Sequence, residues 1–518
     1  MKIQIPTAHP DTDLLLQMLR DKDVIIGDKE QEIAKLKASY QLLLEQFNLA
    51  QKKRFAASSE KLNPFQGDLF NEAESTADEM VENEDIIDVS YTRRKPKRKA
   101  LPENLPREQV IHDIPEAEKT CECCGHELSP MGHDCCEKLV FVPATIKVIE
   151  HIRPKYTCHH CEKHGTEANI KQAPVPPSPI PKGIATASLL SQIITSKFQY
   201  ALPLYRQEMM FKQYGIELSR RTMSDWMLKC ATLLMPLYLL LIKTLRSQKV
   251  IQADETTLKV VNNHRSKSYM WVYCSGFDSP GIGPPDNPLQ HIVIFDYQDD
   301  SRSGDCVIKF LDTYNGYLQS DGYAAYDQTK TIQLGCWAHA RRKFMDAKAV
   351  QPKGKTGKAD MALAYIQKLY RLERRLTDGN ATVAERYQHR QAEAAQILKE
   401  FKVWLDKSLP QISAQCLLGK AIFYTLNQWQ KLMRYLDDGL LSIDNNRAER
   451  AVKPFVIGRK NWLFNQNARG AEASAVLYSI IETAKANGLI AFDYISHCLD
   501  ALSHPDCDIK SLVPWKFS

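Results

Sequence analysis

The chain of 518 residues is long enough for three or four domains of roughly 100–200 residues each. With 44% hydrophobic and 25% charged residues, its composition is that of a globular protein and excludes a wholly disordered or fibrous chain. We find no apolar run of the ~18–20 residues that a membrane helix needs, and no signal peptide at the start, so we expect a cytoplasmic protein without a membrane partner. The net charge of +6 is too small by itself to indicate nucleic acid as a partner.

Residues 14–50 predict one long helix within a first segment, 1–62. Apolar side chains fill the seam positions of about five heptads: Leu15, Leu19, Ile26, Ile33, Leu36, Tyr40, Leu43, Phe47 and Ala50. Lys22 and Lys29 interrupt the seam, so its first half is expected to be weaker. The pattern favours a leucine-zipper-like coiled coil that makes a homo-oligomer. The alternative is an amphipathic helix packed on its own chain.

Two charge blocks of opposite sign mark residues 63–110 as a linker. Residues 71–90 carry eight acidic side chains and no Lys or Arg. A basic block follows them: Arg93, Arg94, Lys95, Lys97, Arg98 and Lys99. Such blocks are usually solvated, so the basic block is either a simple linker or a flexible arm that contacts DNA phosphates.

Residues 111–172 predict a zinc-binding domain. Cys121-x-x-Cys124 and Cys158-x-x-Cys161 are two pairs from separate segments, which can close a tetrahedral thiolate site around one structural Zn²⁺. The stretches Leu139–Val142 and Ile146–Ile152 between them are predicted strands. The alternative ligands nearby are Cys123, Cys135, Cys136, His159 and His160.

Residues 173–248 predict a helical DNA-binding region after a boundary rich in proline. The stretch Leu204–Tyr214 reads as a helix, Gly215 as a turn, and Ser219–Cys230 as a second helix with Ser219 as its N-cap. Arg220 and Arg221 would lie in the first turn of that helix, where a recognition helix meets DNA. A helical hairpin without a DNA role has the same pattern.

From residue 249 the pattern changes to strands, which makes the fold class multidomain α/β. Strands are predicted at Val250–Val261, Ser268–Ser275 and His291–Tyr297, followed by a helix at about Asp305–Tyr314 and a strand at Tyr317–Ser320. This is the opening order of a ribonuclease-H-like core, which we assign to 249–350 and 441–490. Residues 351–440 predict a helical insertion, and 491–518 a C-terminal tail.

Three carboxylates stand out in this core. Asp254 lies in the first strand, Asp321 ends the fourth strand, and Glu449 lies near the start of a helix that Asn445 or Asn446 can cap. Carboxylates from two neighbouring strands and a helix can hold two Mg²⁺ ions, for which Mn²⁺ is expected to substitute. Such a pair stabilises the attacking and leaving oxygens of a phosphoryl displacement. Glu255 should face away from Asp254, because strand side chains alternate.

Further basic residues accompany the carboxylates. Arg341 and Arg342 follow Cys336 and His339, and they predict a helix start that faces DNA phosphates. A Cys-x-x-His pair could also bind a metal, but we read His339 as a phosphate or carboxylate neighbour, or as a buried histidine. Lys453 falls four residues after Glu449 on one helix face, although Pro454 disfavours helical geometry there.

The chain resembles the large transposase of the insertion-sequence-66 family, a bacterial DDE transposase, along nearly its whole length. The matching motifs are Cys121-x-x-Cys124-Gly125, Leu202-Pro203-Leu204-Tyr205, Asp254-Glu255-Thr256, Ser320-Asp321-Gly322-Tyr323, Asn445-Asn446-x-Ala448-Glu449-Arg450 and the stretch Gly458–Phe464. Ala56-Ala57 departs from the glycine that is usual in the family.

The resemblance implies a DNA transposase that binds the terminal inverted repeats of its insertion sequence and catalyses metal-dependent cleavage and strand transfer. It also implies a nucleoid-associated bacterial protein, target DNA as a second substrate, and small accessory proteins of the same element. Two other readings remain open at this point. One is a structure-selective nuclease with the same metal core, and the other is a DNA-binding regulator without catalysis.

Overall fold

The computed structural model describes residues 10–55, 145–156, 171–262, 267–277, 290–298, 302, 304–351 and 357–517. The chain divides into two compact units, Asn83–Pro174 and the remainder, Met1–Glu82 with Val175–Ser518. The predicted acidic and basic blocks, and all four predicted zinc ligands, lie outside the described residues. Within the smaller unit, β1 (Lys155–Tyr156) pairs antiparallel with β2 (Lys171–Gln172). The strand predicted at Ile146–Ile152 is wrong, since these residues have no regular secondary structure.

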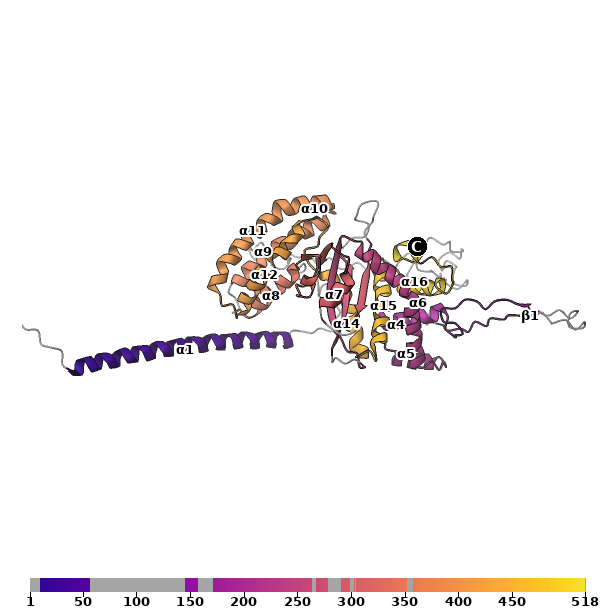
Figure 1. The fold of residues 1–518 in the computed structure, drawn as a ribbon, viewed down its shortest axis with the longest axis horizontal. Helices are drawn as coiled ribbons and strands as arrows, with labels where there is room; N and C mark the ends of the chain where they lie inside the picture. The colour runs from indigo at the N-terminus through magenta and orange to yellow at the C-terminus, as the bar shows by residue number, and fades with distance from the viewer. Residues whose placement is uncertain are drawn as a thin grey trace, which may run out of the picture. The chain divides into compact units, whose positions relative to one another are not determined.

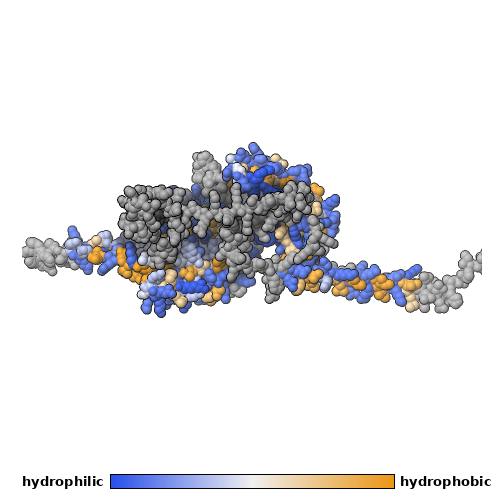
Figure 2. Space-filling model, turned by 180° about the vertical axis from the view of Figure 1, so that it is seen from behind, coloured by the Kyte–Doolittle hydropathy of each residue, from blue (hydrophilic) through white to orange (hydrophobic). Residues whose placement is uncertain are grey.

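The predicted N-terminal helix is confirmed as α1 (Pro10–Phe55). From Leu19 to Ala50 its seam side chains are exposed, with Leu36, Tyr40 and Leu43 each more than 60% accessible. Figure 2 shows these apolar residues in a row between hydrophilic ones. An apolar stripe of this length is typical of a helix that buries it against a partner helix.

We expect polar substitution of the seam to reduce the oligomeric state. Changing Ile33, Leu36, Tyr40 and Leu43 to Ser removes apolar burial worth about 1.5–3 kcal/mol for each side chain. The quadruple variant should then sediment as a smaller species than the wild type at micromolar concentration. Gln31→Ser with Gln41→Ser, at outward heptad positions, is the matched control and should not change the sedimentation. An unchanged mass for the quadruple variant would mean that the seam does not drive association.

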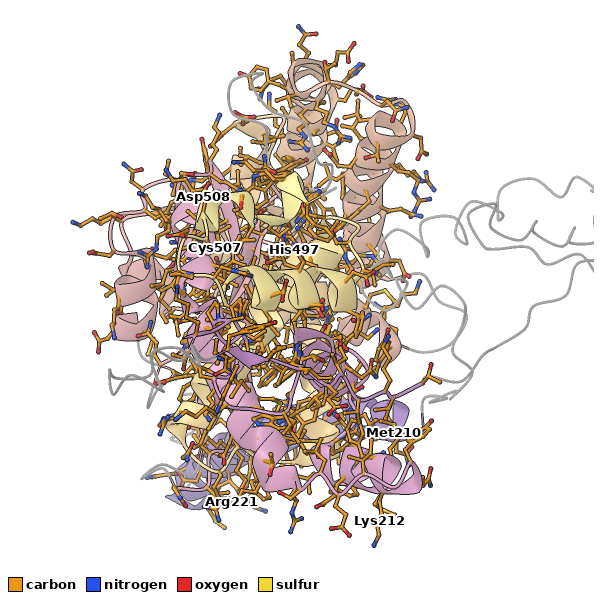
Figure 3. The ribbon with its side chains drawn as sticks, turned by 90° about the vertical axis from the view of Figure 1, so that its right-hand side faces the viewer. Met210, Lys212, Arg221, His497, Cys507 and Asp508 are labelled. Carbon is orange, nitrogen blue, oxygen red and sulfur yellow. The ribbon has the colours of Figure 1, made fainter. Side chains whose placement is uncertain are left out.

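Three helices precede the sheet: α4 (Ala187–Phe198), α5 (Leu204–Gln213) and α6 (Arg220–Arg246). The predicted helix, turn and helix are confirmed: Gly215 adopts φ +76°, and Ser219 Oγ accepts a hydrogen bond from Thr222 N at 3.1 Å. Arg220 and Arg221 are exposed in the first turn of α6. Figure 3 shows Arg221 at the same end of the molecule as Lys212 of α5.

Among the described residues, α6 is the one helix that is long and apolar enough to cross a membrane, a run that the sequence reading did not find. Leu234, Leu237, Leu241 and Leu245 are fully buried within the protein core, and α6 packs against α15 (Ala468–Ala486). The Tyr238 hydroxyl donates to Phe295 O at 2.8 Å. These contacts make α6 a core helix of a folded domain.

Five strands form a mixed sheet in the order β5-β4-β3-β6-β7. Figure 1 shows the strand arrows of this sheet beside α15. β3 (Val250–Leu258), β4 (Ser268–Ser275) and β5 (Val293–Tyr297) pair antiparallel in succession. On its other side β3 pairs parallel with β6 (Tyr317–Gln319), which pairs parallel with β7 (Ile332–Leu334). The predicted strands are confirmed, with β3 three residues shorter than expected. β7 was not predicted, because three residues are too few for a periodic pattern.

Helices cover the sheet and its β5 edge. α7 (Gly304–Leu311) lies between β5 and β6 in the sequence, and its Phe310 ring stacks on Tyr273 of β4 at 3.8 Å. α15 (Ala468–Ala486) packs on β5, where Ser479 Oγ accepts from Phe295 N at 2.8 Å and Thr483 Oγ1 accepts from Val293 N at 3.1 Å. These hydroxyls satisfy backbone groups that an edge strand otherwise leaves unpaired.

The segment predicted as a C-terminal tail contains a packed helix. α16 (Ala491–Ala501) contacts α4 and buries Tyr494, Ile495, Cys498 and Leu499 completely. Its apolar spacing is helical, and it closes the core around α4 and α6. The short turns after residue 501 also pack on this core, where Leu512 and Val513 are buried and Tyr494 Oη donates to Leu512 O at 2.6 Å, so the expectation of a simple tail is wrong.

Residues 351–440, predicted as an insertion, are helical. With α8 (Trp337–Ala349) they form a second hydrophobic core. Its helices are α9 (Lys358–Asp378), α10 (Val383–His389), α11 (Ala395–Ser408), α12 (Leu417–Asn427) and α13 (Trp429–Met433). The buried Arg390 donates to both carboxylate oxygens of Glu373, at 2.8 and 2.7 Å, and ties two segments of this core together.

Candidate active site

Asp254 and Asp321 follow a pair of glutamines on neighbouring parallel strands. Gln252 of β3 lies opposite Gln319 of β6, and each aspartate is two residues further along its chain. In this register Asp254, within β3, lies level with Asp321, two residues beyond Gln319, so the structure brings both aspartates to one edge at the C-terminal end of β6. The glutamines are buried, and Gln252 Nε2 donates to Gln319 Oε1 at 2.8 Å.

Glu449 is held beside this edge by α14 (Asn446–Trp462). Asn445 occupies the N-cap position, but the expected capping hydrogen bond is not made. Its Nδ2 donates instead to Ala253 O at 2.9 Å, next to Asp254. One residue back along β3, Gln252 Oε1 accepts from Ala448 N at 3.3 Å. The start of α14 is thus bonded to the stretch of β3 that precedes Asp254, and this fixes the place of Glu449.

A cavity of about 260 Å³ opens where the strand edge, α8 and α14 meet. Its lining residues are Asp254, His339, Arg342, Glu449, Val452, Lys453 and Val456. Glu449 Oε1 lies 3.5 Å from His339 Nδ1, and its Oε2 lies 3.3 Å from Arg342 Nη2. Glu449 Oε1 and His339 Nδ1 are both buried without a hydrogen bond among the described residues. His339 is therefore a carboxylate neighbour, one of the roles considered from the sequence.

The electrostatics of the site reflect several carboxylates in a confined space. Burial raises the pKa of Asp254 well above its usual range, and the negative charges of Glu255, Glu449 and Asp321 raise it further. Burial lowers the pKa of His339, while the negative charge of Glu449 acts in the opposite direction. The neighbouring carboxylates thus disfavour the ionised form of Asp254, an effect that a bound cation would relieve.

Cys336, His339 and Glu449 each offer a ligand atom, and the three atoms lie within 4.8 Å of one another. Cys336 Sγ, however, already accepts a hydrogen bond from Asn445 N at 3.2 Å. Burial also raises the pKa of this thiol far above its usual range, which disfavours the thiolate that binds metals. Of these three residues, His339 and Glu449 are consequently the ones whose ligand atoms face the cavity.

Glu255 is directed to other partners, as its alternation with Asp254 predicts. Its Oε1 accepts from Arg302 Nη2 at 2.6 Å, and its Oε2 accepts from Tyr326 Oη at 2.9 Å. The Arg302 guanidinium lies 3.9 Å from the ring centre of Tyr323. None of these residues lines the cavity, so Glu255 belongs to a neighbouring buried network.

Lys453 lines the cavity with Glu449, because α14 continues as a helix through Pro454. The expectation that Pro454 would disturb the helix at Lys453 is wrong. A proline removes one backbone N–H and crowds the preceding turn, and this helix accommodates that cost. Arg341 and Arg342 both lie on α8, but only Arg342 lines the cavity.

Sequence reasoning missed the residues that hold the carboxylates in place. Gln252 and Gln319 carry no charge and make contacts across long sequence distances, so no local pattern marks them. Asn445 was predicted only as a helix cap, and its bond to Ala253 was not foreseen. Tyr424 of α12 was also missed, and its hydroxyl donates to Asp321 O at 2.9 Å. The helical core of 357–438 therefore contacts the site directly.

Comparisons with known proteins give the class of the protein. Residues 182–473 match a family model described as "Transposase IS66 family", and residues 118–162 match "zinc-finger binding domain of transposase IS66". Residues 42–110 match "Transposase C of IS166 homeodomain", and residues 479–515 match "IS66 C-terminal element". These matches, with a helix-turn-helix and a strand-edge carboxylate site, define a DNA transposase with DNA-binding regions. The chain belongs to the IS66 family of transposases.

Similar full-length relatives come from Sinorhizobium fredii (strain NBRC 101917 / NGR234). The uncharacterized protein y4jD is 35% identical over 433 residues, which cover 80% of this chain and 81% of the relative. The uncharacterized protein y4qI is 33% identical over 445 residues, which cover 82% of this chain and 78% of the relative.

Proposed function

We propose that the chain cleaves the ends of its own insertion sequence and joins them to target DNA, with Asp254, Asp321 and Glu449 as the catalytic carboxylates. The observation that carries this proposal is the convergence of the three acidic positions at one sheet edge. The order β5-β4-β3-β6-β7, with the first three strands antiparallel and the rest parallel, supports a ribonuclease-H-like core.

The residues of the site fit two divalent cations. The three carboxylates are hard oxygen donors, which Mg²⁺ and Mn²⁺ prefer. Glu449 Oε1 is a buried acceptor without a hydrogen bond among the described residues, and it faces the cavity that Asp254 also lines. When bound, such a metal pair supplies charge stabilisation for in-line phosphoryl displacement, first by water and then by the freed 3′-hydroxyl.

The basic residues around the cavity have a separate task. Arg342 and Lys453 line the cavity on the two helices that enclose it, so they can hold the phosphates on either side of the scissile bond. Arg342 is about half exposed, and its 3.3 Å pairing with Glu449 holds it over the cavity before DNA arrives. Val452 and Val456 form the apolar wall of the same cavity and limit the water that enters it.

DNA recognition is assigned to parts of the chain outside the cavity. Arg220 and Arg221 are exposed at the start of α6, where they can reach the bases of the terminal repeats. The block from Arg93 to Lys99, with Arg341, adds contacts to phosphates that do not depend on sequence. Self-association through α1 would bring two transposon ends together, with accessory proteins of the element as further partners.

The test is an assay of purified full-length protein with labelled duplexes that carry the two terminal repeats of its own element. With Mg²⁺ or Mn²⁺ we expect cleavage at the repeat ends and products joined to target DNA. Ca²⁺ should allow binding with little cleavage, and EDTA should stop cleavage. Cleavage without joining, at sites unrelated to the repeats, would instead indicate a nuclease. Binding without cleavage under all metal conditions would indicate a regulator.

Zinc is expected to be structural. Metal analysis should find about one Zn per chain, lost when Cys121 and Cys158 are changed to Ser, because thiolate ligation is coupled to folding. Residues 115–170 should then become sensitive to limited proteolysis. Cys416→Ser, a free cysteine of the helical core, is the control and should keep the metal. A metal-free protein with an equally protected 115–170 segment would contradict the prediction.

A further inference from the structure

The turn after α14 holds a leucine in a backbone conformation that leucine rarely adopts. Leu463 has φ 69° and ψ −38°, and Phe464 N donates to Trp462 O across it at 2.8 Å. A three-residue turn with a positive central φ is strained for a residue that carries a Cβ. Glycine would adopt this conformation without steric cost. The side chain of Leu463 therefore lowers the stability of the fold at this position.

Contacts on both sides of Leu463 hold this strained turn. Before it, Trp462 packs edge-on against Phe198 with the ring centres 6.1 Å apart, and Asn461 Nδ2 donates to Ala201 O at 2.9 Å. After it, Asn465 N donates to Lys259 O at 2.9 Å, and Asn465 O accepts from Val261 N at 2.9 Å. Strained backbone persists only where the surroundings determine it in this way, and such places often serve function.

The turn presents two apolar side chains to solvent, which we name the Leu463–Phe464 tip. Leu463 is 68% exposed and Phe464 is 43% exposed. Residues 459–469 contain Arg459, Lys460 and Arg469 and no acidic residue. Arg459 is bonded to Thr256 Oγ1 at 2.9 Å, whereas Lys460 and Arg469 are exposed. Two exposed apolar side chains between exposed cations fit a partner that has an anionic surface and an apolar interior.

We propose that the Leu463–Phe464 tip is a wedge that inserts between base pairs of the transposon end, while Lys460 and Arg469 contact the flanking phosphates. DNA-bending proteins use apolar side chains of this kind to unstack a base step, and phosphate contacts fix the position on the duplex. The inference rests on the proposed function of this chain as a transposase that acts on duplex ends. It assigns a DNA-distorting role to residues outside the catalytic cavity.

The geometry also gives the position of the distorted step. Leu463 lies fourteen residues after Glu449 along α14. At 1.5 Å per residue this is about 21 Å, which equals about six base pairs of duplex DNA at 3.4 Å per pair. For a duplex that runs along α14, the unstacked step therefore lies about six base pairs from the scissile phosphate.

The experiment places 2-aminopurine, whose fluorescence rises on unstacking, at each of the first ten positions of a terminal-repeat duplex. Full-length wild type, bound in Ca²⁺, should raise the fluorescence several-fold at one step and little elsewhere. Leu463→Gly with Phe464→Ala should abolish that rise, while fluorescence anisotropy shows that the DNA is still bound. Leu463→Gly alone should not lower the melting temperature of the free protein, because glycine relieves the strained φ.

Ile490→Ala removes another exposed apolar side chain, 69% accessible, and should leave the fluorescence rise unchanged. A full rise with the double variant overturns the wedge. If the wild type binds the transposon ends but raises the 2-aminopurine fluorescence at no step, the wedge is overturned. The proposed function still stands in that case. A wild type that binds no terminal-repeat DNA overturns both.

Discussion

Asp321→Asn and Glu449→Gln are expected to abolish cleavage and joining of transposon ends while DNA binding is retained. The substitutions keep the shape of each side chain and remove the charge that two divalent cations require. Metal stabilisation of the transition state is worth several kcal/mol, so the rate should fall on the order of a thousandfold or more. The measurement is cleavage of a labelled terminal-repeat duplex by each variant, beside its binding to the same DNA.

The controls separate catalysis from folding. Asp327→Asn changes a carboxylate that is about half exposed and pairs with Lys431, so it should cleave at the wild-type rate. Glu255→Gln should be milder than the site variants, although it weakens the ion pair with Arg302. Wild-type cleavage by either site variant would mean that the active site is misplaced. Loss of binding together with cleavage would mean that these residues hold the fold.

We expect Asp254→Asn to raise the stability of the metal-free protein and to abolish its cleavage activity. Asp254 is partly buried among other carboxylates, which raises its pKa above its usual range, so its ionised form costs stability in the metal-free protein. A folded-state pKa above the unfolded value means that the ionised form costs stability as the pH rises toward neutrality. The neutral amide removes that cost, so its melting temperature should exceed that of the metal-free wild type, without detectable cleavage.

The sequence predicted the elements of the core because their patterns are local. The strand around Asp254 begins with Val250 and Ile251 and ends with Thr256, Thr257 and Leu258, and Ser219 marks the start of α6 with its own side chain. Only strand order was then needed to infer that two aspartates share an edge. The effect of Pro454 on helical geometry at Lys453 was overestimated, because the tertiary packing of α14 outweighs the local preference of a residue before proline for extended backbone.

Other features could not be predicted because they depend on contacts between distant segments. Leu463 gives no signal of a positive φ, since the usual marker of that conformation is glycine or asparagine. The bond between Asn445 and Ala253 joins residues 192 positions apart, and it replaces the local cap that the sequence indicates. Likewise, nothing near Gln319 marks it as the partner of Gln252.

These glutamines form a buried network that links every element of the site. Gln252 Nε2 donates to Gln319 Oε1 at 2.8 Å and to Asp444 O at 3.0 Å. Gln319 Nε2 donates to Gly335 O at 3.2 Å and to Ser442 O at 2.8 Å. The network thus joins β3 and β6 to the segments that precede α8 and α14. Each carboxylate or its cavity partner lies within a few residues of one of these contacts.

Gln319→Leu is therefore expected to lower both stability and cleavage. The substitution leaves Ser442 O and Gly335 O without a side-chain donor. It also removes one of the two acceptors of Gln252 Nε2, and each buried polar group left unpaired costs about 1–3 kcal/mol. The free energy of unfolding should fall by roughly 2–4 kcal/mol. Because the carboxylates lose their support, cleavage should fall about 10–100-fold even where the protein is fully folded.

Leu318→Ala is the matched control for this substitution. Leu318 is the neighbouring residue on β6, is fully buried, and alternates to the other face of the sheet. Its truncation should cost a similar 2–5 kcal/mol of stability through a cavity, without disturbing the carboxylate edge. Cleavage rates and their Mg²⁺ dependence, measured well below both melting temperatures, should fall only for Gln319→Leu. Equal losses of activity in the two variants would assign the effect to general destabilisation and would reject a positioning role for the glutamine pair.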